Sequence, residues 1–288
     1  MKRHPKVTGT LLLSALFLAP AANSQTNGDM TEISSRLGYS DLVDLALAAR
    51  ATVVVTVRDA IRLKGPDAAN VAPGHVRFYV NGDVNALIAG SSGVPASVSW
   101  LVDLPLDAAN HPPKLKKLKL ILLARPIPGK PGTLQLVARG AQFMWSPDLE
   151  QQLRGILSAA NAPSAPPVVT GVTHAFHVAG TIPGEGETQI FLKTADNRPV
   201  SINIDRHPNQ DPRWSVSLGE IVDDAAAAPQ HGTLLWYRLA CALPPRLPAN
   251  SVTDQAPDDA DQAQRDYQLV LKQLGPCGRT LSAGDAAN

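Results

Sequence analysis

The stretch from residue 174 to residue 222, HAFHVAGTIPGEGETQIFLKTADNRPVSINIDRHPNQDPRWSVSLGEIV, contains the densest strand and turn signals in the chain. β-Branched and aromatic residues alternate there with polar residues, and Gly, Pro, Asn and Asp separate the alternating runs. Such a pattern is typical of short, half-buried strands joined by turns. The sequence therefore predicts a β-rich domain in the second half of the protein.

An earlier part of the chain follows a similar plan, about 115 residues before it. That spacing is too long for a solenoid repeat and fits duplicated domains. The alternative is that β-rich domains share such alternation without a common origin, and the sequence leaves both explanations open. The matched segments are 59–65 with 174–180, 76–80 with 188–192, 96–100 with 213–217, 122–126 with 238–242, and the helices 148–159 with 258–274.

The predicted fold class is mainly β with a few helices (α+β), arranged as two tandem small β-sheet or barrel domains, each followed by a C-terminal helix. A chain of 288 residues fits one large or two medium domains and can bury a sizeable core. The predicted boundaries are a signal peptide over 1–24, a polar leader and packing helix over 25–50, a first β-rich domain over 51–160, a Pro-rich linker over 161–167, and a second β-rich domain with its terminal helix over 168–288.

Local signals place individual elements in the first half of the chain. Residues 75–88 are predicted to form two strands around an Asn81-Gly82 turn, because this dipeptide is a strong hairpin signal. Ser146 is expected to cap a helix, with Pro147 in its first turn. The remaining expected elements are a helix from near Ser40 and strands over 52–63, 96–104, 115–124 and 134–137.

The first 24 residues have the three parts of a secretory signal peptide. A basic start precedes an apolar run from Thr10 to Ala19 that is too short to span a bilayer, and small residues follow it. Cleavage is expected after Ala21 or Ser24, which predicts a periplasmic or secreted protein. No later apolar run approaches about 18 residues, so the sequence does not predict an integral membrane protein.

The charge balance argues against bulk nucleic-acid binding. Removal of the signal peptide, with Lys2, Arg3 and Lys6, takes the basic count from 26 to 23 against 25 acidic residues, a net charge of about −2. Binding to nucleic acid depends on a clear excess of positive charge. We therefore expect no nucleic-acid partner.

The sequence contains no motif for a metal, a nucleotide or a catalytic nucleophile. His174 and His177 are three residues apart, so on a strand they point to opposite faces and cannot chelate one metal ion. Cys241 and Cys277 lack the CxxC spacing of zinc sites. We predict neither a metal nor a cofactor.

Acidic residues at the ends of two predicted strands are the candidate catalytic groups. Glu185 and Glu187 flank a glycine at the entrance to one strand, and Glu220 and Asp223 follow another. Carboxylates brought together can act as an acid–base pair or bind a cation. Acidic residues in exposed loops are far commoner, so an unusual hydrolase that uses these residues is the alternative function rather than the preferred one.

A basic run, Lys114, Lys116, Lys117 and Lys119, is the candidate binding patch. On the strand predicted over 115–124, Lys117 and Lys119 share one face. The run is either a solvated strand face that protects an edge or a docking patch for anionic lipid or glycan.

The only two cysteines, Cys241 and Cys277, are predicted to form a disulfide, because export places them in an oxidising compartment. Cys241 ends a predicted strand, TLLWYRLAC at 233–241, and Cys277 follows the terminal helix in a Gly-Pro-Cys-Gly turn. The bond is expected to hold that helix on the second sheet.

The segments GEGETQIFL, WSVSLGEIVD, WYRLAC, QLGPCGR and KLKKLKLILLARPIPG resemble an exported family of uncharacterised alphaproteobacterial proteins. The resemblance covers most of the mature chain but includes no catalytic signature. The family has no assigned activity, so the resemblance transfers no functional residues. Together these observations favour a non-enzymatic periplasmic binding or scaffold protein of the cell envelope, whose partner is an envelope protein, an anionic lipid or a glycan.

Overall fold

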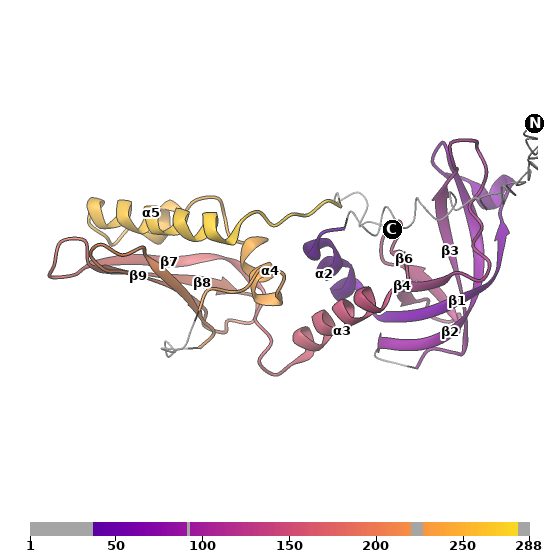
Figure 1. Cartoon of the computed structure of the whole chain (residues 1–288), viewed down its shortest axis with the longest axis horizontal. Helices are drawn as coiled ribbons and strands as arrows, with labels where there is room; N and C mark the ends of the chain where they lie inside the picture. Colours follow the sequence, from indigo (N-terminus) through magenta and orange to yellow (C-terminus); the bar gives the residue numbers. More distant parts are fainter. Residues whose placement is uncertain (1–36, 91–92, 220–226, 282–288) are drawn as a thin grey trace, which may run out of the picture.

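The computed structural model describes residues 37–90, 93–219 and 227–281. Two β-sheets lie at opposite ends of an elongated molecule, with helices α2 (Tyr39–Ala48), α3 (Pro147–Asn161) and α4 (Leu234–Ala240) between them (Figure 1). The expected class, mainly β with a few helices, is confirmed. The predictions that concern the signal peptide, the start of the leader, Glu220 and Asp223 fall outside the described residues.

The first sheet closes into a five-stranded barrel. Its strands follow the order β1-β2-β3-β5-β4, and β4 pairs back with β1. β3 and β5 are parallel, and the other neighbouring strands of the barrel are antiparallel. This connectivity is that of the OB-fold, a Greek-key barrel. The bounds are β1 (Ala51–Arg62), the 3-10 helix η2 (Gly65–Ala68), β2 (His75–Gly90), β3 (Ser97–Pro105), β4 (Lys119–Pro126), β5 (Thr133–Leu136) and β6 (Gln142–Met144), which pairs with β4.

β2 is one continuous strand, so the predicted hairpin at Asn81-Gly82 is wrong. Both neighbouring strands pair with β2 through this dipeptide, and Asp59 of β1 and Ser99 of β3 lie opposite Asn81. The glycine serves packing instead, because a Cβ atom on Gly82 would lie 3.1 Å from the buried ring of Trp100. Long-range strand pairing therefore overrides the local turn signal.

The helices expected near Ser40 and after Ser146 are present as α2 and α3. The Ser146 hydroxyl accepts a hydrogen bond from Leu149 N at 3.2 Å, which caps α3 as predicted. Leu153 and Ile156 are the buried residues of α3. Because α3 contacts α2, α4 and β2, it connects the barrel to the helices in the middle of the molecule.

Residues 234–240 form helix α4, so the strand predicted over 233–241 is wrong. The Thr233 hydroxyl caps the helix by accepting a hydrogen bond from Trp236 N at 3.2 Å. The segment is apolar at nearly every position, and such a run does not distinguish a buried helix from a buried strand. Contacts with α2, α3 and α5 bury Trp236 and Leu239 at helical spacing.

The second sheet is an open antiparallel meander with the order β10-β9-β8-β7. Helix α5 (Pro257–Leu274) covers one of its faces and buries Tyr267 and Val270 (Figure 1). The open second sheet differs from the closed barrel of the first. The duplication also matches a barrel strand with residues 238–242, part of which belongs to α4. The duplication therefore stays a prediction. The bounds are β7 (Val169–Ala179), β8 (Gly186–Thr194), β9 (Ser201–Arg206), β10 (Arg213–Ser217) and the 3-10 helix η3 (Ala249–Ser251).

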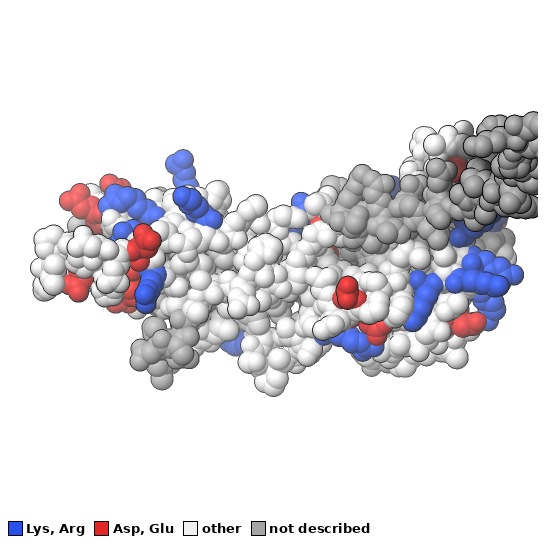
Figure 2. Space-filling model, viewed as in Figure 1, with Lys and Arg blue, Asp and Glu red and all other residues white. Residues whose placement is uncertain are grey.

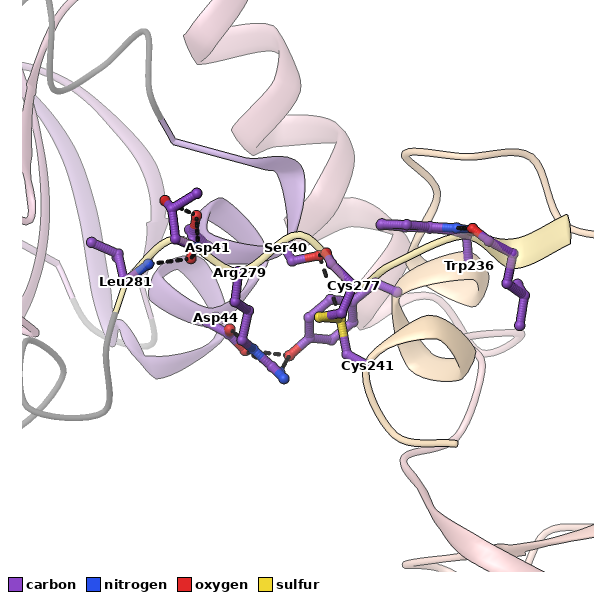
Figure 3. Close-up of a disulfide and its surroundings, with 11 residues drawn as sticks. Ser40, Asp41, Asp44, Trp236, Cys241, Cys277, Arg279 and Leu281 are labelled. Carbon is purple, nitrogen blue, oxygen red and sulfur yellow. Dashed lines mark hydrogen bonds and ion pairs between the residues drawn. A yellow bond between two sulfur atoms is a disulfide. The ribbon is translucent and has the colours of Figure 1, made fainter. Parts of the chain in front are cut away.

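Residues 275–281, which we call the clasp, leave α5 and join α4 to α2 in the middle of the molecule (Figure 3). Cys277 of the clasp forms the predicted disulfide with Cys241 at the end of α4, and their Cα atoms are 4.8 Å apart. Ser40 of α2 donates its hydroxyl to Cys277 O at 2.5 Å. The bond was expected to hold α5 on the second sheet, but Cys241 ends α4 and not a strand of that sheet, so the disulfide ties the clasp to α4. It thereby also fixes the segment that reaches α2.

Asp41 of α2 is the main acceptor for the clasp, although it is only 1% exposed. Its carboxylate accepts hydrogen bonds from Thr280 Oγ1 at 2.6 Å, from Thr280 N and Leu281 N at 3.0 Å, and from Gly38 N at 3.1 Å. Burial by itself raises the pKa of Asp41, but these hydrogen bonds together outweigh burial and hold that pKa below its ordinary value. The clasp is thus bound through a charged carboxylate.

We expect the double variant Cys241→Ser, Cys277→Ser to be less stable by about 4 kcal/mol, the loop-closure value for a disulfide whose cysteines are 36 residues apart. Denaturant unfolding of the variant and of the oxidised wild type measures the difference. The reduced wild type serves as the control and should match the variant. Equal midpoints for the variant and the oxidised wild type would show that the bond does not stabilise the fold.

Acid should destabilise the protein partly through Asp41. Because the folded-state pKa of Asp41 lies below the unfolded value of about 3.9, its contribution is fully present above about pH 5 and is lost as the pH falls through the folded-state value. The Asp41→Asn variant should lose about 2 kcal/mol at pH 7 and show a shallower loss of stability in acid. Urea unfolding from pH 3 to pH 7 measures both effects.

The matched control for this experiment is Asp196→Asn, which removes an exposed carboxylate whose pKa is lowered chiefly by a hydrogen bond from Arg198. It should leave stability at pH 7 nearly unchanged, because exposed ion pairs contribute little. The same acid profile for Asp41→Asn and the wild type would contradict the role assigned to Asp41.

Candidate functional site

The barrel wall contains a cleft of about 580 Å³ between β3 and β5. The parallel pairing of these two strands ends at Trp100 and Leu134. The following residues of β5 pair with β4, so residues 101–105 of β3 have no partner strand on this side within the described ranges. The cleft therefore follows from the shortness of β5.

Apolar side chains form the floor and one wall of the cleft. Tyr79 and Leu101 lie opposite each other on β2 and β3 and are 36% and 49% exposed. Ile61 of β1 continues this cross-strand row beside the cleft and is 54% exposed. Outward positions of such strands are usually polar, so the row indicates a contact surface. Buried residues at the floor are Trp100, Val102, Leu134, Leu136 and Ala138.

Cations predominate among the charged side chains of the cleft. Arg77 and Asp103 form a bidentate pair with distances of 2.7 and 2.8 Å, and this pairing raises the pKa of Arg77. Lys130, between β4 and β5, and Arg139, after β5, have no ionic partner in the part of the chain that the structure describes. The charges of Arg77 and Asp103 cancel, so Lys130 and Arg139 give the rim of the cleft an excess of positive charge.

This arrangement suits binding better than acid–base chemistry. Of the residues that the structure describes, Asp103 is the only carboxylate that lines the cleft, and Arg77 already occupies both of its oxygens. The row of Tyr79 and Leu101 offers a flat apolar surface on which a ring can stack, and the cations beside it can pair with carboxylate, sulfate or phosphate groups. Among the described residues, no group of three or more His, Cys, Asp or Glu side chains is placed to hold a metal ion.

The structure describes two of the four acidic candidates, Glu185 and Glu187, at the end of the second sheet remote from the barrel. Glu185 lies in the β7–β8 loop and is half-buried beside Gly180. Glu187 is exposed on β8 and accepts a hydrogen bond from Gln189 at 2.9 Å. Neither lines the cleft, and their described surroundings do not join them to a histidine or an arginine.

The basic run does not lie on one strand, so the predicted shared face of Lys117 and Lys119 is wrong. β4 begins only at Lys119, and Lys117 has a φ of 70° in the turn before it. Lys119 is half-buried, with its Nζ 3.3 Å from the ring centroid of Trp145. Lys114, Lys116 and Lys117 remain exposed. On the face shown in Figure 2, basic side chains cover more of the barrel end than acidic ones do.

A buried polar network in the second half of the protein brings together groups that also occur in catalytic sites. Asp266 of α5 is fully buried and accepts a hydrogen bond from Thr188 Oγ1 at 2.5 Å. The Thr188 hydroxyl therefore accepts from Nδ1 of His177, 2.9 Å away. Arg206 donates from Nε to Asp266 at 2.7 Å. His177, Thr188 and Arg206 belong to strands of the second sheet, and hydrogen bonds link all three to Asp266 of α5 directly or through Thr188. The network therefore fixes α5 on the sheet.

His177 and His174 point to opposite faces of β7, as predicted. His177 lies among the residues beneath α5, whereas the ring of His174 is 6.2 Å from that of Phe176 on the other face. Gln255 side-chain oxygen also accepts a hydrogen bond from His177 N at 2.8 Å. The geometry therefore gives His177 a structural role.

Asp266→Ala should destabilise the protein by about 3 kcal/mol, because it leaves Arg206 and the Thr188 hydroxyl without their acceptor. Asp261→Ala removes an exposed carboxylate from the same helix and should change stability by less than about 0.5 kcal/mol. Thermal and urea unfolding of the two variants measure the contrast. Similar stabilities for both variants would contradict the pinning role.

The cleft residues were not among the candidates that the sequence suggested. The available signal was the pair Tyr79 and Leu101, which place apolar side chains at positions where the alternation of β2 and β3 calls for polar ones. Lys130 and Arg139 carry no local signal, since only barrel closure brings them to the same opening.

Comparison with known proteins gives no family assignment: no protein-family model matches the chain, and no curated protein matches it. None of the described helices is long and apolar enough to cross a membrane. The assignment of function therefore rests on the site itself.

Proposed function

We propose that this is an exported, non-enzymatic binding protein of the cell envelope, whose barrel cleft holds an extended anionic saccharide. The observation that carries the proposal is the combination of the exposed Tyr79 and Leu101 with the unpaired cations Lys130 and Arg139 around one opening. Export is proposed from the tripartite N-terminus and from the resemblance to an exported family. The two β-rich units are proposed to be tandem modules.

A saccharide fits the chemistry of the cleft better than the other envelope ligands do. Sugar rings stack on aromatic and aliphatic surfaces, and an acidic sugar also supplies the anions that Lys130 and Arg139 lack. Greek-key barrels with this connectivity bind oligosaccharides or oligonucleotides over the face of strands 2 and 3 and the β4–β5 loop, where this cleft lies. Among the described residues, only two cations without an ionic partner line the cleft, which is fewer than the many phosphate contacts on which nucleic-acid affinity depends.

The alternative, a hydrolase that uses the acidic residues of the second domain, has no comparable support. Glu185 and Glu187 lie apart from the cleft, and Glu187 is bound to Gln189. A catalytic pair requires a second group within reach of the same substrate atom, with a pocket around both. We therefore do not propose this activity.

The proposal is tested by isothermal titration of the full protein with an oligogalacturonate, a saccharide with a carboxylate on each ring. We expect binding that weakens with salt. Tyr79→Ala and the double variant Lys130→Gln, Arg139→Gln should each weaken it at least about tenfold, since each removes about 1.4 kcal/mol or more. The matched control is Lys114→Gln, Lys116→Gln, Lys117→Gln, which removes the exposed lysines of the basic run.

The outcomes separate the alternatives. Loss of binding in the triple lysine variant but not in the cleft variants would move the anion site to the basic run and contradict the proposal. Equal binding of a neutral malto-oligosaccharide would show that the cations are not used. Tighter binding of an oligothymidylate than of the saccharide would make the ligand a nucleic acid.

A further inference from the structure

A second cavity, of about 670 Å³, lies where the barrel meets the helices in the middle of the molecule. It is bounded by α2 and the start of β1, the end of β2, α3 and α4. Its volume is in the usual range for small-molecule sites. Most of the lining residues are small or apolar: Ala46, Leu47, Ala49, Ala89, Gly90, Leu157 and Ala160. The polar lining residues are Arg50, Thr52, Asn161 and Arg238.

In the part of the chain that the structure describes, two arginines and no acidic residue line this cavity. Arg238 comes from α4, and its Nε is buried without a hydrogen-bond partner. Arg50 connects α2 to β1, and its backbone N donates to Ala124 O at 2.9 Å, which fixes the position of the residue. The Arg50 side chain has no partner within the described ranges. Two guanidinium groups from different elements therefore meet at one mostly apolar cavity, where an anion would find positive charge on two sides.

An apolar groove continues from the cavity along α3. It has a volume of about 530 Å³ and shares Ala89, Leu157 and Asn161 with the cavity. Ile88 adds a further apolar side chain to the groove. Its one charged residue, Arg154, already pairs with Glu150 at 2.7 Å. The groove therefore continues the apolar walls and adds no unpaired charge.

We propose that the cavity and groove bind an amphiphilic anion, with its oxyanion head between Arg50 and Arg238 and its apolar chain along α3. Guanidinium groups pair with phosphate or carboxylate oxygens, often through two parallel hydrogen bonds. The chain removes the apolar surfaces of Ala89 and Leu157 from water. The head contacts α2 and α4 at once, so the ligand bridges the barrel and the second half of the protein. This inference is independent of the function proposed for the cleft.

The test uses dodecyl phosphate below its micellar concentration, titrated into the full-length protein and followed by calorimetry. Arg50→Gln and Arg238→Gln should each weaken binding at least about tenfold. Arg213→Gln and Arg265→Gln remove exposed arginines that line neither the cavity nor the groove, and they should leave the affinity unchanged. Melting temperatures establish that each variant is folded, and because Arg50 is exposed, Arg50→Gln keeps the test valid if Arg238→Gln unfolds.

Comparison of ligands tests the two parts of the proposal separately. Affinity should rise from inorganic phosphate through butyl phosphate to dodecyl phosphate, and dodecyltrimethylammonium should not compete. Equal affinity for inorganic and dodecyl phosphate would overturn the role of the groove. Binding that survives Arg50→Gln in a folded protein, or equal binding of the cationic amphiphile, would overturn the anion site. Vesicles of phosphatidylglycerol that compete with dodecyl phosphate would identify a lipid headgroup as the source of the anion.

Discussion

The arrangement of the molecule depends on the buried carboxylate of Asp41. A charge with 1% exposure is stable only if donors surround it, and α2 itself supplies one donor, Gly38 N. The others come from Thr280 and Leu281, 239 and 240 residues further along the chain. The need to satisfy one carboxylate therefore sets the path of the clasp. Since no described strand of the barrel pairs with a described strand of the second sheet, the helices and the clasp hold the two ends of the molecule together.

The two cavities arise from different causes. The cleft exists because β5 is too short to follow β3 along its length, which exposes the barrel wall beside Tyr79 and Leu101. The second cavity exists because three helices and a strand end meet without filling the space around Arg50 and Arg238. Both combine apolar walls with cations that have no ionic partner among residues 37–90, 93–219 and 227–281. Both are consistent with recognition of anions.

Local signals in the sequence were sufficient where a single residue type controls the outcome. Ser146 begins α3, and the two lone cysteines form the disulfide. The Asn81-Gly82 signal failed because β1 and β3 both pair with β2 through that point. The strand predicted over 233–241 is helix α4 in the structure. An apolar run without clear periodicity does not distinguish a helix from a strand, so packing against neighbouring elements determines which one forms.

The site could not be predicted from the sequence, because barrel closure creates it. Tyr79 and Arg139 are 60 positions apart, and the sequence around each residue contains no signal that the two lie at the same opening. The basic run shows the opposite error. Its lysines are adjacent in sequence, but the left-handed turn at Lys117 separates them from Lys119, whose ammonium group lies on Trp145. Spacing predicts shared faces only where a regular strand exists.

The path of the clasp also implies an order of assembly. The clasp joins Asp41 to Thr280 and Leu281, which lie about 240 residues further along the chain. Strands β1 to β6, by contrast, pair with one another within one contiguous part of the chain. Until the clasp arrives, Asp41 has few donors and must remain hydrated. Because contacts between distant segments carry a larger entropy cost of loop closure, we expect the junction to form after the barrel strands have paired.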